Sequence, residues 1–134
     1  MAVEIALVCA QLVLVAVFGR AGFFHSARFA GFARDPRYHW AGAVGRLRMR
    51  VIGVAEIAAA AGLAVSISVG IAAPSLVIFG GWLAVASALG LTLLSAAAVG
   101  FHVARGEIDA TIAPSLLAVL AGSVVAGRIA AGSL

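Results

Sequence analysis

The sequence predicts an all-α membrane protein, folded as a four-transmembrane-helix bundle. Hydrophobic residues make up 64% of the 134 residues and charged residues only 10%, whereas about 25% of a soluble domain is charged. No Asp, Glu, Lys, Arg or His occurs from Ile57 to Phe101. A run of this length without charge is typical of membrane-spanning segments. One domain, residues 1–134, accounts for the whole chain.

A membrane-spanning helix needs about 20 mostly apolar residues, and four runs approach or exceed that length. The small uncharged residues 66–74 end in Pro74 and predict a break between the second and third helices, since Pro suits the first turn of a helix. The expected helices cover approximately residues 3–24, 51–67, 75–101 and 110–128.

The connector between the first two helices, residues 25–50, differs in kind from the apolar runs. It contains six Arg against one acid, Asp35, with Phe, Tyr and Trp interleaved among them. Arg and aromatic side chains together are typical of the membrane–water boundary. We expect a partly helical interfacial segment that meets anionic lipid headgroups. Nucleic acid is not an expected partner, because membrane helices tie the segment at both ends.

The arginines also predict the orientation of the chain. With four helices, the first and third connectors share one side, and eight of the nine Arg lie there. The positive-inside rule places that side in the cytoplasm and both termini outside, in a multi-pass plasma-membrane protein. On the outer side, Glu4 and Arg128 are expected to lie close together.

A short pattern, F-H-x-A-R, occurs twice. Residues 24–28 and 101–105 both carry it, and each copy ends a long apolar run. This echo predicts two similar hairpins related by an approximate two-fold axis along the membrane normal. His25 and Arg28, like His102 and Arg105, are three apart and share a helix face.

Glu56 is the one carboxylate expected inside a helix core. A carboxylate at that depth usually faces the bundle interior or a cavity, and Gly53, one turn earlier, opens space on the same face. Two interpretations remain open: a structural ion pair with Arg20, or a ligand or proton site. Glu56 and His102 are the candidate catalytic residues.

One interpretation of the polar helix ends is a shared ligand pocket on the cytoplasmic side. The alternative is simple anchoring, with Arg side chains reaching the headgroups. We expect no metal, because no further Cys, His or acid cluster joins the two His, and the single cysteine, Cys9, excludes paired-thiol chemistry. The candidate ligand-binding residues are Arg20, His25, Arg50, Glu56, His102, Arg105 and Glu107.

Three short motifs resemble those of the DoxX-like family of four-helix bacterial membrane proteins. The second helix contains R-V-I-G-V-A-E, residues 50–56, followed by A-G-L at 61–63; the third ends H-V-A-R-G-E, residues 102–107; and Gly127-Arg128 closes the chain. The first helix departs from the family pattern, since His25 stands where Lys is expected. The resemblance implies the four-helix fold, a bacterial inner membrane, and an association with quinol oxidase or sulfur oxidation.

Three classes of function remain open. The first is a redox-associated subunit that binds a quinone, or another lipophilic small molecule, near the cytoplasmic face. The second is a small membrane isomerase or cyclase that uses Glu56 and His102 as acid and base on a lipid-like substrate. The third is a non-catalytic accessory subunit. Each allows a membrane-complex partner or a homo-oligomer.

Overall fold

The computed structural model describes residues 2–38 and 40–132, without the side chains of Arg37 and Pro74. Its described residues form helices and turns and no strand, and four helices are long and apolar enough to cross a membrane. The predicted four-transmembrane-helix class is therefore confirmed. The long helices are α1 (Ala2–Ala27), α4 (Arg46–Ala72), α5 (Val77–Ala104) and α6 (Ile112–Ala130).

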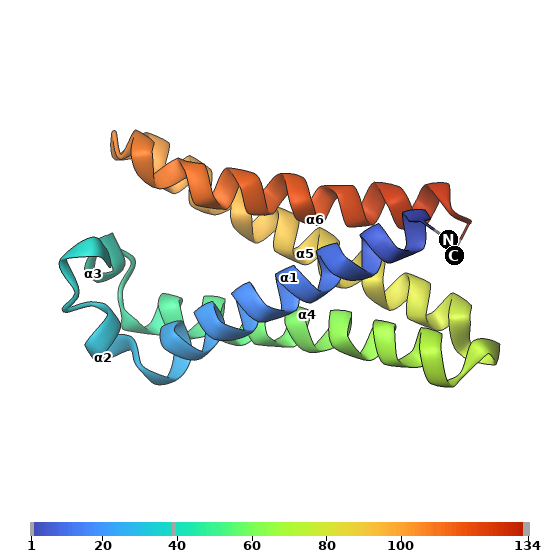
Figure 1. The fold of residues 1–134 in the computed structure, drawn as a ribbon. Coiled ribbons are helices and arrows are strands. Elements are labelled where there is room, and N and C mark those ends of the chain that lie inside the picture. Colours follow the sequence, from blue (N-terminus) through green and yellow to red (C-terminus); the bar gives the residue numbers. More distant parts are fainter. Residues whose placement is uncertain (1, 39, 133–134) are drawn as a thin grey trace.

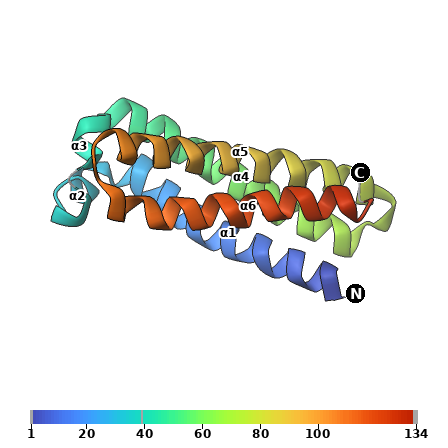
Figure 2. The same cartoon turned by 90° about the horizontal axis from the view of Figure 1, so that it is seen from above.

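The four helices run alternately up and down along one axis (Figures 1 and 2). Both chain ends and the short helix η2 (Pro74–Leu76) lie at one end of the bundle, called here the terminal end. The first connector and η3 (Ile108–Thr111) lie at the opposite end, called the connector end. Helix α1 packs mainly on α4 and also on α6, and α5 packs on both α4 and α6.

The first connector is partly helical, as predicted. It consists of α2 (Phe29–Phe32), η1 (Pro36–Tyr38) and α3 (Trp40–Val44), each too short to span a membrane. Gly45 then turns the chain into α4 with a positive φ of 86°, a conformation that Gly adopts without steric cost.

Helix α4 is longer at both ends than the sequence pattern indicates. It begins at Arg46 rather than near residue 51 and runs to Ala72, so the predicted break over residues 66–74 is confined to its last residues, at Ala73 and Pro74. The hydroxyls of Ser66 and Ser68 bond back to the carbonyls of Leu63 and Ala64, at 2.8 and 3.0 Å. These hydroxyls are satisfied inside the helix, so the small polar residues do not end it.

The core is a narrow strip along the bundle axis, built largely from small side chains. Many large apolar residues elsewhere are exposed; Ile71 and Val119, for example, are more than 70% exposed. Such side chains suit a lipid surround, in which helix packing depends on close approach through small residues. The core residues are Leu14, Phe18, Ala60, Leu63, Ala84, Ala88, Leu91, Ala121 and Val124.

Candidate functional site

The first element of the site is a His–Glu pair between α1 and α4. His25 Nδ1 lies 2.7 Å from Glu56 Oε2, and the two side chains are only 12% and 8% exposed. Two facing glycines bring the helices together here. A Cβ on Gly53 would lie 2.6 Å from the carbonyl oxygen of Gly22, too close for any other residue without a shift. The glycines therefore position the pair.

The second element is a compact turn at the end of α5. Gly106 has a positive φ of 71°, which turns the chain back at the helix end. The Glu107 amide donates to the His102 carbonyl at 2.9 Å, and the Gly106 amide donates to the Val103 carbonyl at 3.0 Å. These two bonds form a Schellman cap. The cap folds the Glu107 carboxylate back onto the helix it follows. There its Oε2 lies 2.8 Å from His102 Nδ1, and Arg105 Nε donates to Oε1 at 2.7 Å.

Trp40, at the start of α3, contacts both histidines. Its ring centroid lies 6.3 Å from that of His25 and 5.2 Å from that of His102, edge to face in each case. Phe32 and Phe101 lie 5.8 and 6.4 Å from the same ring, and Tyr38 stacks on Phe32 at 4.2 Å. We call Phe32, Tyr38, Trp40 and Phe101 the aromatic cluster.

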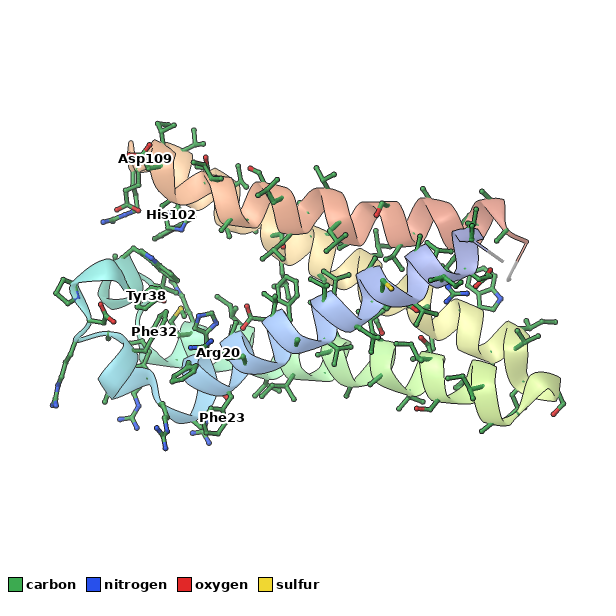
Figure 3. All side chains as sticks on the ribbon, viewed as in Figure 1. Arg20, Phe23, Phe32, Tyr38, His102 and Asp109 are labelled. Atoms are coloured by element: carbon green, nitrogen blue, oxygen red, sulfur yellow. The ribbon has the colours of Figure 1, made fainter. Side chains whose placement is uncertain are left out.

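Figure 3 labels Phe32, Tyr38 and His102, which all lie at the connector end. His102 points from α5 toward the side of the bundle that carries Phe32 and Tyr38. The site thus joins the first connector, α1, α4 and α5, and His102 itself is only 5% exposed.

The two histidines share one chemical feature. In each, a carboxylate lies against Nδ1, and such a partner selects the tautomer or protonated form in which Nδ1 carries a hydrogen. In the neutral ring the other nitrogen, Nε2, is then the acceptor. The carboxylates come from different places, Glu56 from α4 and Glu107 from the turn after α5. The repeated F-H-x-A-R pattern therefore contains both histidines, but it does not contain the carboxylates that pair with them.

Five of the seven candidate ligand-binding residues lie at the connector end in these two polar groups: His25, Glu56, His102, Arg105 and Glu107. Arg20 and Arg50 do not join them. The Arg20–Glu56 ion pair, one of the two interpretations left open for Glu56, does not form: Arg20 is exposed and its guanidinium lies over the Phe24 ring, 5.6 Å from the centroid. Arg50 is also exposed and forms no ion pair with another described residue.

The rotation of α1 about its axis explains why Arg20 does not contact Glu56. Similar depth in the membrane is not enough to bring Arg20 to Glu56, because the side chain must also lie on the face of α1 that meets α4. Five residues separate Arg20 from His25, which at 3.6 residues per turn puts them on different faces of α1. The face carrying Gly22 and His25 meets α4, so the acid receives a histidine rather than an arginine.

The role of Trp40 was not predicted, because an aromatic residue in a connector carries no spacing that relates it to a distant helix end. Its interleaving with arginines indicated only the membrane boundary. At the opposite end the predicted proximity of Glu4 and Arg128 is confirmed, with Arg128 Nη1 donating to Glu4 Oε2 at 2.9 Å. Among the described residues, no three His, Cys, Asp or Glu side chains are grouped so as to hold a metal ion.

The sequence model described as the DoxX-like family matches residues 9–124, most of the chain. No curated protein sequence and no solved structure gave a significant match.

Proposed function

This chain belongs to the DoxX-like family, and we propose that it is a redox-associated membrane subunit that binds a quinone or another lipophilic small molecule at its connector end. In this proposal the connector end faces the cytoplasm of a bacterium, and both termini lie outside the inner membrane. Anionic headgroups then surround the arginines of the connector.

The observation that carries the proposal is the contact of Trp40 with both carboxylate-paired histidines. A quinone has a flat ring that stacks on aromatic side chains. When it is reduced, each of its two oxygens takes up a proton. Two His–carboxylate pairs near one aromatic cluster match these needs, since His exchanges protons readily near neutral pH.

The proposal gives this chain binding and proton handling only. Glu56 holds His25, and Glu107 holds His102, so that each ring presents Nε2 for proton exchange. Arg105 bonds to the other oxygen of Glu107 at 2.7 Å and fixes that carboxylate. Electrons for a redox step come from an oxidoreductase partner in the membrane.

The aromatic cluster also favours a second candidate, an isomerase or cyclase acting on a lipid-like substrate. Aromatic faces stabilise a positive charge held above them, as in a carbocation formed by protonating a double bond. His25 with Glu56, or His102 with Glu107, would supply and withdraw that proton. This candidate predicts an altered product, whereas the quinone proposal predicts a retained ligand.

Lipid extraction combined with native mass spectrometry distinguishes these proposals. We expect the wild-type protein to carry a quinone through purification, and Glu56→Gln and Trp40→Leu to retain at least tenfold less. Asp109→Asn is the matched control, because it removes a carboxylate at the same end from an exposed position outside the two His–Glu pairs.

Three results would contradict quinone binding. One is a wild-type protein free of quinone that converts an added isoprenoid, which supports the isomerase. Another is a stoichiometric protein partner with no small molecule, which supports an accessory subunit. The last is equal quinone retention in wild type, Glu56→Gln and Trp40→Leu, which removes the connector end as the binding place.

A further inference from the structure

The terminal end holds a second polar network, separate from the connector end. Gln11 is fully buried on α1, and its Oε1 accepts a hydrogen bond from Arg128 Nη2 at 3.1 Å. Its Nε2 lies 3.4 Å from Ser66 Oγ on α4. Arg128 also binds Glu4, so one guanidinium links α6, α1 and, through Gln11, α4.

One donor in this network has no hydrogen-bond partner among the described residues. Arg128 Nε is buried, and no described group accepts its hydrogen. Buried polar groups in proteins nearly always have a hydrogen-bond partner.

A cavity of about 210 Å³ lies beside this arginine. Arg128, Glu4 and Ser66 form its polar wall, and four aliphatic residues together with three glycines form the rest. A cavity of about 150 Å³ is known to hold a benzene molecule, so this one has room for a ring-sized group. The aliphatic and glycine residues are Val8, Ile67, Gly70, Ile71, Val77, Gly80 and Gly81.

We propose that this cavity is a second ligand site, which takes a neutral lipophilic molecule whose ring-sized head carries a hydroxyl or carbonyl oxygen. The oxygen accepts a hydrogen bond from the guanidinium of Arg128, and the ring contacts the aliphatic wall. A neutral head is favoured because Glu4 already balances the charge of Arg128 at 2.9 Å. An anionic head would lie beside the Glu4 carboxylate and be repelled by it.

A photoreactive 4-octylphenol, with a diazirine on its chain, tests the site in the full-length protein in nanodiscs. Saturable labelling is expected on peptides that line the cavity. Unmodified 4-octylphenol should compete, and octylbenzene, which lacks the hydroxyl, should compete at least tenfold less well. Equal competition by octylbenzene overturns the proposed polar recognition.

Two variants locate the binding. Arg128→Lys keeps the charge but loses the planar set of donors, and Gly70→Phe adds a ring at the cavity wall. A Cβ on Gly70 meets no atom within 4 Å, so the substitution should leave the fold intact. Gly90→Phe is the matched control, because Gly90 is equally open but does not line the cavity. Each of the first two variants should lower labelling at least tenfold and the control should not; unchanged labelling in both overturns the proposal.

Discussion

Glu56 lies where a membrane-spanning helix rarely carries a charge, and its partner is a histidine rather than an arginine. The pair is short, 2.7 Å, and nearly closed to solvent. Hydrogen bonds that involve a charged group contribute about 1.5–3 kcal/mol. The pair is therefore strong enough to matter for stability as well as for ligand binding.

The substitution Glu56→Gln, compared with Arg20→Gln, tests whether Glu56 is paired with His25 or with Arg20. Gln keeps the size of the side chain but cannot carry the charge, so we expect a loss of about 1–3 kcal/mol in the free energy of unfolding. Arg20→Gln, which removes an exposed arginine from a similar depth, should change it by no more than about 0.5 kcal/mol. Unfolding in a denaturing detergent measures both. Equal destabilisation by the two substitutions would indicate that Glu56 is paired with Arg20 instead.

Helices α1 and α4 cross where Gly22 faces Gly53, and this crossing holds His25 against Glu56. A Cβ on Gly53 would also lie 2.7 Å from the amide nitrogen of Ser26 and 2.9 Å from the Cβ of His25. The helices must therefore separate to admit any side chain. The close contact between Gly22 and Gly53 holds the two helices together here, and the His25–Glu56 contact depends on it.

We expect Gly53→Ala to destabilise the protein by about 1–3 kcal/mol, the usual cost of overpacking a close contact. It should also lower ligand retention at the connector end by separating His25 from Glu56. Gly19→Ala is the control, because a Cβ there meets no atom within 4 Å. It should be neutral or stabilising by up to about 1 kcal/mol, as Ala favours the helix. A Gly53→Ala protein as stable as the control would show that the crossing tolerates a side chain.

The long helices were predictable from the sequence because the apolar runs are long and their ionisable residues few. Their ends were less predictable. The expected connector included Arg46, Arg48 and Arg50 because of their charge, yet α4 begins at Arg46. A helix that emerges at the membrane surface can carry arginines on its first turns. The serines near residue 66 indicated a break, but their hydroxyls bond within the helix.

The sequence predicted which residues belong to the candidate site better than it predicted which of their side chains contact each other. Glu56 and His102 stand out because each is ionisable within or at the end of an apolar run. The pairing of Glu56 with His25 depends on the rotation of α1 about its axis, which depth alone does not give. The position of Trp40 depends on how the connector folds across the end of the bundle, and no local spacing encodes that.

At the scale of the whole molecule, the two ends of the bundle carry different chemistry. The connector end holds the aromatic cluster and most of the arginines, and the terminal end holds the Gln11–Arg128 network. The asymmetry of the arginines predicts that the connector end faces the cytoplasm. The direction of insertion then decides which compartment each site faces.

Cysteine labelling tests this orientation. In a Cys9→Ala background, an impermeant thiol reagent added to intact cells should modify Ser75→Cys, in the loop at the terminal end. It should not modify Arg34→Cys in the connector until the cells are opened. Both positions are exposed, so a difference reports the side of the membrane. Labelling of Arg34→Cys alone in intact cells would reverse the orientation.

The most direct measurement for the connector-end site uses the two tryptophans of the chain. Trp40 contacts both histidines, whereas Trp82 lies on α5 next to Gly81, which lines the terminal-end cavity. Trp82→Phe leaves only Trp40, and Trp40→Phe leaves only Trp82. Each protein in nanodiscs is titrated with a short-chain benzoquinone, which quenches tryptophan fluorescence on contact.

We expect saturable quenching in the Trp82→Phe protein. Adding Glu56→Gln to that protein should raise the concentration for half-saturation at least tenfold. The Trp40→Phe protein should show only the weak linear quenching of a residue exposed to dissolved quinone. Linear quenching of equal slope in the two single-tryptophan proteins would contradict quinone binding beside Trp40.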